Sequence, residues 1–170
     1  MMKGFLFLVI MCCGVNIAWS QAQEQEAPLK AAFIYNFTHY IEWDNDIHDE
    51  FVIGVIGSSP VATSLSMIAK TKTVNNKKII IQYYNKPEEI EDCQVLFIPQ
   101  NLPYSLRTIL DNTVKGTLTV SEEEGYGKLG AAFNFVIRNE KLKFEANRKS
   151  IAASGLKAGS QLLKLAIIVE

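Results

Sequence analysis

The side chains best placed for chemistry follow the first apolar run of the chain, residues 51–56. Gly57, Ser58, Ser59 and Pro60 come directly after this run. Ser59 has the residue type of a helix N-cap, and Pro60 suits the first helical position. In an open α/β sheet, a loop between a strand and a helix is where small ligands and anions bind. Ser58 and Ser59 are therefore the candidate ligand-binding residues, although an ordinary helix start would use the same residues, and no dinucleotide or P-loop motif accompanies them.

One segment carries side chains with metal-ligand chemistry. Its members are His39, Glu42, Asp44, Asp46, His48 and Asp49. Their spacing matches no zinc or calcium motif, so we expect a polar surface segment with no metal and no other cofactor. Glu122–Glu124 offers three adjacent carboxylates, which we interpret as a solvated turn.

The case for nucleophilic catalysis is poor. The chain has no Gly-x-Ser-x-Gly elbow, and Cys93 begins an apolar run instead of an electropositive helix end. We expect Cys93 to be a small buried hydrophobe, with pairing between subunits as the less favoured alternative. An enzyme would need a polar cleft that joins distant residues, such as His39 with Glu122–Glu124. We therefore predict that the protein is not an enzyme.

The first twenty residues have the form of a secretory signal peptide. A short positive start is followed by an apolar run, and Ala18-Trp19-Ser20 is a small-x-small cleavage site. We predict cleavage near Ser20, export to the periplasm, a flexible lead-in over residues 21–27 and one domain over residues 28–170. Cys12 and Cys13 leave with the leader, so Cys93 remains alone and no disulfide forms within the mature chain. The net charge of −1 gives no basic surplus for nucleic acid.

An aromatic segment opens the predicted domain. Residues 30–43 are periodic like a helix, and we predict a core helix over this range. Its expected buried face is Leu29, Phe33, Phe37, Tyr40 and Ile41. Burial of each large apolar side chain would contribute roughly 1.5–3 kcal/mol, so the remainder of the chain must cover this face.

The rest of the chain alternates between strand and helix patterns. Predicted strands span residues 51–56, 78–84, 93–98 and 116–120, and predicted helices span residues 60–69, 104–111 and 155–166. Residues 132–137 and 141–146 are strands of a β-hairpin, with Phe133, Phe135 and Ile137 on one face. The pattern predicts an α/β domain with a mixed, mainly parallel sheet, helices on both faces and a C-terminal β-hairpin plus helix.

Several segments together resemble one family of exported bacterial proteins, the YfiR-like family. In order, they are LKAAFIYNFTHYIEW, FVIGVIGSSPVATSL, CQVLFIP, LTVSEEEGYG, FNFVIRNEKLKFEAN and GLKAGSQLLKLA. The resemblance implies a periplasmic α/β domain without known catalysis. Its best-known member represses an inner-membrane diguanylate cyclase by binding the periplasmic region of the cyclase, and an OmpA-like outer-membrane lipoprotein sequesters that repressor.

The resemblance also implies a homodimer and a departure from the family pattern. The best-known member is gated by disulfides, whereas this chain keeps only Cys93. We expect a regulator that lowers cyclic di-GMP by holding a membrane diguanylate cyclase or sensor kinase inactive. From residue type, the expected contacts are Tyr35, Trp43, Tyr126 and the C-terminal helix. The alternative is a small-molecule-binding sensory module that feeds such a kinase or cyclase, built on the loop 57–60 and the crossing 125–130.

Overall fold

A computed structural model describes the backbone of residues 14–43 and 49–170 and the side chains of residues 26–43 and 49–170. Its helices are α1 (Gly14–Phe37), α2 (Pro60–Ala69), the 3-10 turn η1 (Pro87–Glu89), α3 (Leu106–Asp111), α4 (Tyr126–Leu129), α5 (Arg148–Ala153) and α6 (Ser160–Leu165). Its strands are β1 (Ile41–Trp43), β2 (Glu50–Ile56), β3 (Thr73–Val74), β4 (Lys77–Tyr84), β5 (Val95–Ile98), β6 (Leu118–Ser121), β7 (Phe133–Arg138), β8 (Lys141–Asn147), β9 (Leu156–Ala158) and β10 (Ile167–Val169).

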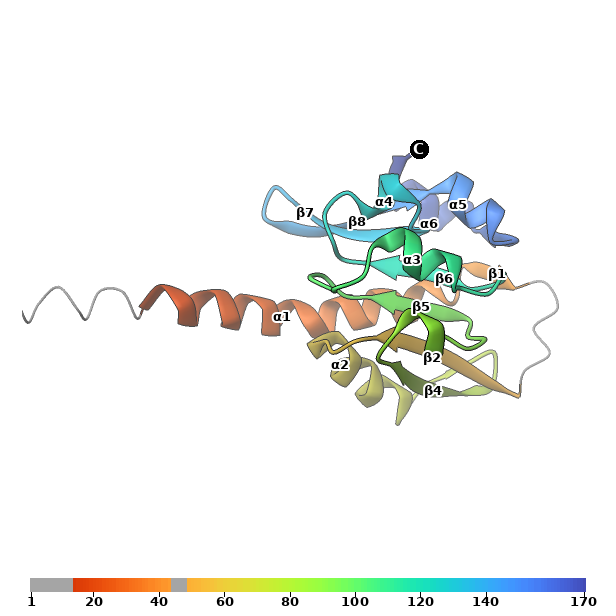
Figure 1. The fold of residues 1–170 in the computed structure, drawn as a ribbon, viewed down its shortest axis with the longest axis horizontal. Helices are drawn as coiled ribbons and strands as arrows, with labels where there is room; N and C mark the ends of the chain where they lie inside the picture. Colours follow the sequence, from red (N-terminus) through yellow and green to blue (C-terminus); the bar gives the residue numbers. More distant parts are fainter. Residues whose placement is uncertain (1–13, 44–48) are drawn as a thin grey trace, which may run out of the picture.

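The main sheet confirms the predicted fold class. Its strand order is β10-β8-β7-β6-β5-β2-β4-β3, and β1 and β9 form a separate two-stranded sheet. The central strands β4, β2, β5, β6 and β7 run parallel, whereas the β7–β8 hairpin and the β3 edge are antiparallel. The domain is therefore α/β with a mixed, mainly parallel sheet (Figure 1).

Helices cover both faces of this sheet. Every residue of β5 is buried, as expected for a parallel strand enclosed on two sides. Val95 and Phe97 of β5 share a core with residues of α1 and α2, while Leu96 and Ile98 share a second core with residues of α3. The period-2 alternation of a strand thus divides one apolar run between two layers of helices.

The predicted helix over residues 30–43 is wrong at its C-terminal end. Helix α1 stops at Phe37, and Ile41–Trp43 forms strand β1. Strand β1 pairs antiparallel with β9, where Trp43 lies opposite Leu156. A partner more than a hundred residues away decides this conformation, and a local period cannot reveal it.

The predicted buried face of α1 is partly wrong as well. Leu29 and Tyr40 are 48% and 42% exposed, although Phe37 is buried as expected. Among the described side chains of α1, the buried ones are Ala27, Ala31, Ile34 and Phe37. Small alanines allow α1 to lie close to the sheet, so this face is rotated away from the large side chains that suggested it. Residues 21–27, expected as a flexible lead-in, lie within α1.

The predicted C-terminal helix over residues 155–166 is confirmed only over residues 160–165. Leu156–Ala158 is strand β9, Ser160–Leu165 is the short helix α6, and the chain ends in β10 beside β8. The backbone N–H of Gly159 donates to the carbonyl of Tyr40 at 2.7 Å, which ties this segment to the turn after α1. Leu162 and Leu163 therefore lie in a helix, as predicted, whereas Leu156 lies in a strand.

Other local predictions are confirmed. Helix α2 begins at Pro60, and the Ser59 hydroxyl accepts from the backbone N–H of Val61 at 3.1 Å. The β7–β8 hairpin turns at Asn139 and Glu140, both with positive φ, as a two-residue turn of this kind requires. Each of these features depends on contacts between neighbours in the sequence.

Candidate functional site

The strand order places a topological switch point between β2 and β5. From β2 the chain moves outward to β4 on one side and then returns to β5 on the other side. The loops that leave the carboxyl ends of β2 and β5 therefore diverge. In open α/β sheets this divergence creates the crevice where ligands bind.

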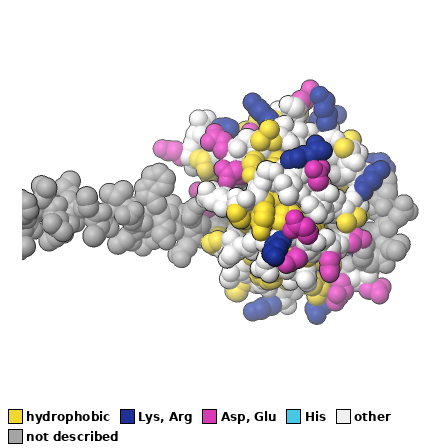
Figure 2. Space-filling model, in the orientation of Figure 1, with side chains coloured by type: hydrophobic (Ala, Val, Ile, Leu, Met, Phe, Trp, Pro, Cys, Tyr) yellow, Lys and Arg dark blue, Asp and Glu magenta, His cyan; other side chains and the backbone are white. Residues whose placement is uncertain are grey.

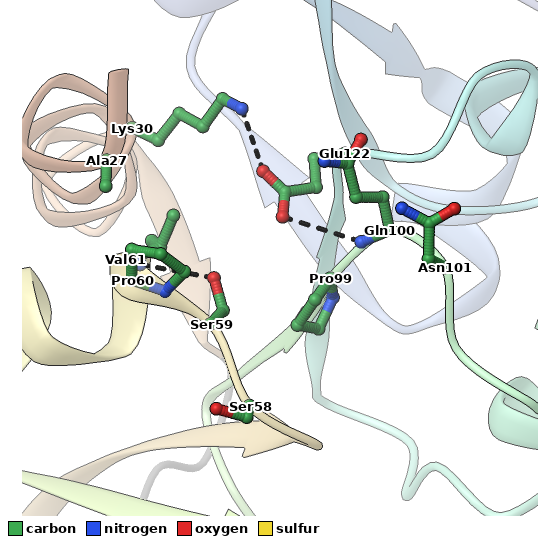
Figure 3. Close-up of a pocket in the computed structure, with 10 residues that line it drawn as sticks. All are labelled: Ala27, Lys30, Ser58, Ser59, Pro60, Val61, Pro99, Gln100, Asn101 and Glu122. Carbon is green, nitrogen blue, oxygen red and sulfur yellow. Dashed lines mark hydrogen bonds and ion pairs between the residues drawn. The ribbon is translucent and has the colours of Figure 1, made fainter. Parts of the chain in front are cut away.

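A cavity of about 210 Å³ lies at this point. Its lining residues, shown in Figure 3, are Ala27, Lys30, Ser58, Ser59, Pro60, Val61, Pro99, Gln100, Asn101 and Glu122. The structure thus places both predicted ligand-binding serines in one wall of a cavity. Ser59 is buried as the cap of α2, whereas Ser58 is exposed and its hydroxyl has no hydrogen bond to another described residue.

An ion pair crosses the top of the cavity from α1 to the loop after β6 (Figure 3). The Nζ atom of Lys30 lies 2.8 Å from Oε2 of Glu122, and the two side chains are only 12% and 8% exposed. The same Nζ lies 3.2 Å from Oε2 of Glu26, one helical turn earlier. The backbone N–H of Gln100 donates to the other oxygen of Glu122 at 3.5 Å. Glu122 thereby joins α1, β5 and β6 at the carboxyl edge of the sheet.

A second cavity, of about 380 Å³, adjoins the first on the hairpin side. It is lined by Glu26, Lys30, Gln100, Glu122, Glu124, Phe135, Val136, Ile137, Arg138 and Leu142. Lys30, Gln100 and Glu122 line both cavities. We call the two cavities together the carboxyl-edge cleft. It has a polar chamber beside residues 57–60, which we call the serine loop, and a more apolar chamber beside the β7–β8 hairpin.

Sequence reasoning missed the charged pair at the centre of this cleft. The sequence alone assigns no role to Lys30, and Glu122 is interpreted from it as part of a solvated turn. One signal was available: Glu122 directly follows a predicted strand, as Ser58 does. Carboxyl ends of parallel strands share one edge of the sheet, so these two residues were candidates for one site.

Two of the aromatic residues expected to contact a partner lie on the α1 side of the sheet. The hydroxyl of Tyr35 donates to the carbonyl of Thr73 at 3.2 Å. The indole N–H of Trp43 donates to the carbonyl of Gln94 at 3.2 Å, and its ring packs edge-on against Phe51. Both side chains are half-buried and take part in packing.

Tyr126 lies apart from these two residues. It begins α4 and packs against the second core, on the opposite face of the sheet. Burial, with a smaller effect from Glu123, raises the pKa of its phenol. The structure therefore does not gather Tyr35, Trp43 and Tyr126 on one surface, and their role in partner binding stays a prediction.

The metal-ligand segment predicted over residues 39–49 is described only in part. Asp44, Asp46 and His48 lie outside the described residues, and no group of three or more metal-ligating side chains occurs among the residues that are described. His39 packs edge-on against Tyr35 just beyond the C-terminus of α1. Nine residues separate it from Lys30, which corresponds to roughly 13 Å along a helix, so it is not brought to Glu122.

Cys93, the one cysteine among the described side chains, is buried, as predicted. Burial raises the pKa of the Cys93 thiol to about 11. Burial also raises the pKa of the neighbouring Tyr84 to about 12, and the Tyr84 hydroxyl has no hydrogen-bond partner among the described residues. A thiol that stays protonated at neutral pH is a poor nucleophile.

Buried amides hold the loops on this side of the sheet. Asn134 accepts from the Ser121 hydroxyl at 2.7 Å and donates to Glu145 at 3.0 Å. Asn147 donates to the carbonyl of Gly127 at 2.9 Å and caps α5. These two asparagines therefore fix the geometry of the loops that they contact.

Comparison with known proteins identifies the family. A family model described as YfiR/HmsC-like (DUF4154) matches residues 27–167. The chain therefore belongs to the YfiR/HmsC-like family, which is a family of regulatory domains and not a known enzyme family. No curated protein matches the sequence. Among the described residues, no helix combines the length and apolar character needed to cross a membrane.

Proposed function

We propose that this protein is a periplasmic regulator that binds and represses a membrane-bound sensor, an inner-membrane diguanylate cyclase, and thereby lowers cyclic di-GMP. The observation that carries the proposal is the family match over residues 27–167. One further feature supports it: residues 1–20 have the sequence pattern of a signal peptide. A sensor kinase is the second type of membrane partner that we consider.

Repression in this proposal is a shift between two states of the sensor. A bound protein shifts such an equilibrium only as far as its affinities for the two states differ. The regulator must therefore bind the inactive sensor more tightly than the active one. An OmpA-like lipoprotein that competes for the regulator would relieve repression, and a homodimer would present two copies of the binding surface.

The C-terminal helix supplies the most exposed apolar side chain near the end of the chain. Leu165 of α6 is 74% exposed, and Ile168 of β10 is half-exposed close by in the sequence. Exposed apolar residues of this kind gain energy when a partner covers them. We therefore propose α6 as the sensor contact, and Tyr35, Trp43 and Tyr126 are alternative contact positions on other parts of the surface.

The test is site-specific crosslinking in the source bacterium. A photoreactive amino acid at Leu165 should crosslink to a diguanylate cyclase identified by mass spectrometry. Met67 of α2, which is also exposed, is the matched control position and should give no such crosslink. A crosslink at Met67 and not at Leu165 would contradict the assignment of the interface to α6. Failure to recover a cyclase from Leu165, Met67 or any of the three aromatic positions would contradict the proposed function.

A second function, binding of a small molecule, is favoured by the carboxyl-edge cleft. The cleft lies at the switch point of the sheet and contains a largely buried ion pair between two cavities. A ligand at such a site would raise the melting temperature with its concentration. A thermal-shift screen of periplasmic metabolites tests this function, and an unchanged melting temperature across the screen would contradict it.

A further inference from the structure

We infer that the carboxyl-edge cleft binds a small organic amine with an apolar body, its ammonium group beside Glu124 and its body against the β7–β8 hairpin. This inference rests on the small-molecule function proposed above and names the class of ligand. It depends on the shape of the larger cavity, on the charges around it, and on the saturated donors of the serine loop.

The larger chamber has an apolar wall large enough for a ring or a short chain. Phe135, Val136, Ile137 and Leu142 of the hairpin line a cavity of about 380 Å³. Ile137 is 46% exposed, although its neighbours on the same strand face are buried. This apolar surface is open to solvent, and its burial by a ligand would stabilise the complex. The ligand needs an apolar part.

The charges around this chamber favour a cation. Its charged side chains are Glu26, Lys30, Glu122, Glu124 and Arg138. Lys30 is shared between two of the carboxylates, at 3.2 Å from Glu26 and 2.8 Å from Glu122. Acidic side chains also gather at this end of the domain in the space-filling view (Figure 2).

The two remaining charges leave one carboxylate uncompensated. The guanidinium of Arg138 lies 3.7 Å from the carboxylate of Glu145, which is outside the lining of the cleft. Glu124 is exposed and makes no ion pair with another described residue. An ammonium group would therefore find a free carboxylate at the rim, whereas an anion would meet net negative charge.

The serine loop offers little to an anion. Pro60 has no N–H, the N–H of Val61 is bound by the Ser59 hydroxyl, and the N–H of Ala62 is bound by the Ser59 carbonyl at 3.1 Å. The first donors of α2 are thus already used, so its N-terminus does not act as a phosphate or carboxylate site. The phosphate or carboxylate role considered for Ser58 and Ser59 is not supported by this geometry.

The test uses three probes that share one apolar body: phenethylamine, phenylpropanoate and phenylethanol. Titration calorimetry with the purified protein at neutral pH should detect binding of the amine, with the alcohol weaker and the acid weakest. Glu124→Gln should weaken amine binding about threefold and leave the alcohol unchanged, because it removes one charge from a solvated site. Ile137→Ala should weaken the amine and the alcohol alike, also about threefold, because it removes part of the apolar wall.

Glu88→Gln, on the exposed turn η1, is the matched charge control and should leave all affinities unchanged. Preference for the acid would overturn the amine assignment while leaving small-molecule binding intact. Equal affinity of the amine for the Glu124→Gln variant and the wild type would overturn the position of the ammonium group. No binding of any probe would overturn the inference, and the crosslink at Leu165 would still test the regulatory function independently.

Discussion

The hairpin strands β7 and β8 present two faces of different chemistry. On the α1 face, Phe133 and Phe144 pack with Phe37, with ring centroids 4.7–5.6 Å apart. On the opposite face, Asn134 and Glu145 form a buried hydrogen-bonded chain. Residues that alternate along the same two strands thus build an aromatic core and a polar network.

The difference between the faces indicates a division of labour. Aromatic packing contributes stability largely in proportion to the apolar area that it buries. A buried polar network contributes little net stability but is costly to leave unsatisfied, so it fixes geometry. We infer that the aromatic face anchors α1 on the sheet and that the polar face positions the loop around α4.

The largest effect is expected on the aromatic face. Phe37→Ala removes a fully buried ring that contacts four other phenylalanines. It should lower the free energy of unfolding by about 3–5 kcal/mol in urea denaturation. Tyr40→Ala, at an exposed position three residues later, is the control and should change it by less than about 0.5 kcal/mol. Similar losses for the two variants would refute the assignment of α1 to the core.

The polar face can be tested by adding one carbon atom. A Cβ at Gly127 would lie 2.5 Å from Oε2 of Glu145. Gly127→Ala should therefore destabilise the domain by about 1–3 kcal/mol because the α4 loop must shift. Lys128→Ala, an exposed neighbour on α4, should be close to neutral by the same urea assay. A neutral Gly127→Ala would mean that the network does not hold this loop.

The cleft at the end of both faces depends on one ion pair. Lys30→Met should cost about 1–3 kcal/mol, since it leaves a largely buried Glu122 without its charged donor. The exposed pair Arg107–Asp111 provides the comparison, and Arg107→Met should cost only about 0.3–0.5 kcal/mol. Equal costs, measured at low and at high salt, would show that Lys30 is no better shielded than a surface residue.

A further effect is expected in the pH dependence of the core that contains Cys93, Leu96 and Ile98. Folding raises the pKa of Cys93 from its ordinary value of 9.0 to about 11, so the unfolded chain releases this proton first. The contribution of the thiol to stability should be complete below about pH 9 and should be lost as pH rises toward 11. Urea midpoints at pH 7, 9 and 10.5 measure this loss, and Cys93→Ala should reduce its slope. A steeper slope in the variant would contradict the burial of the thiol.

The sequence alone predicts what neighbours in the chain decide. The Ser59–Pro60 start of α2, the turn at Asn139 and the uniformly apolar β5 all follow from local capping, turn and pattern rules. Those rules were enough for the fold class. They were also enough to place the serine loop after a strand, which is the correct edge of the sheet for a ligand.

The rest depends on contacts between distant residues. Strand β1 exists because β9 lies beside it, and the cleft exists because the sheet brings Glu122 to Lys30, 92 residues away in the chain. A helical period fits residues 30–43 equally well, and the position of Glu122 just after a strand does not reveal that Lys30 lies beside it. Local sequence rules do not give the order of the strands in the sheet, and this order decides which loops lie next to each other.

The most direct measurement of the central claim is the cyclic di-GMP content of a strain that lacks this gene. The account predicts a rise, reversed by the full chain and not by a chain without residues 1–20, because the regulator must reach the periplasm. Unchanged cyclic di-GMP in the deletion strain, with the cyclase present, would contradict repression as the function of this domain.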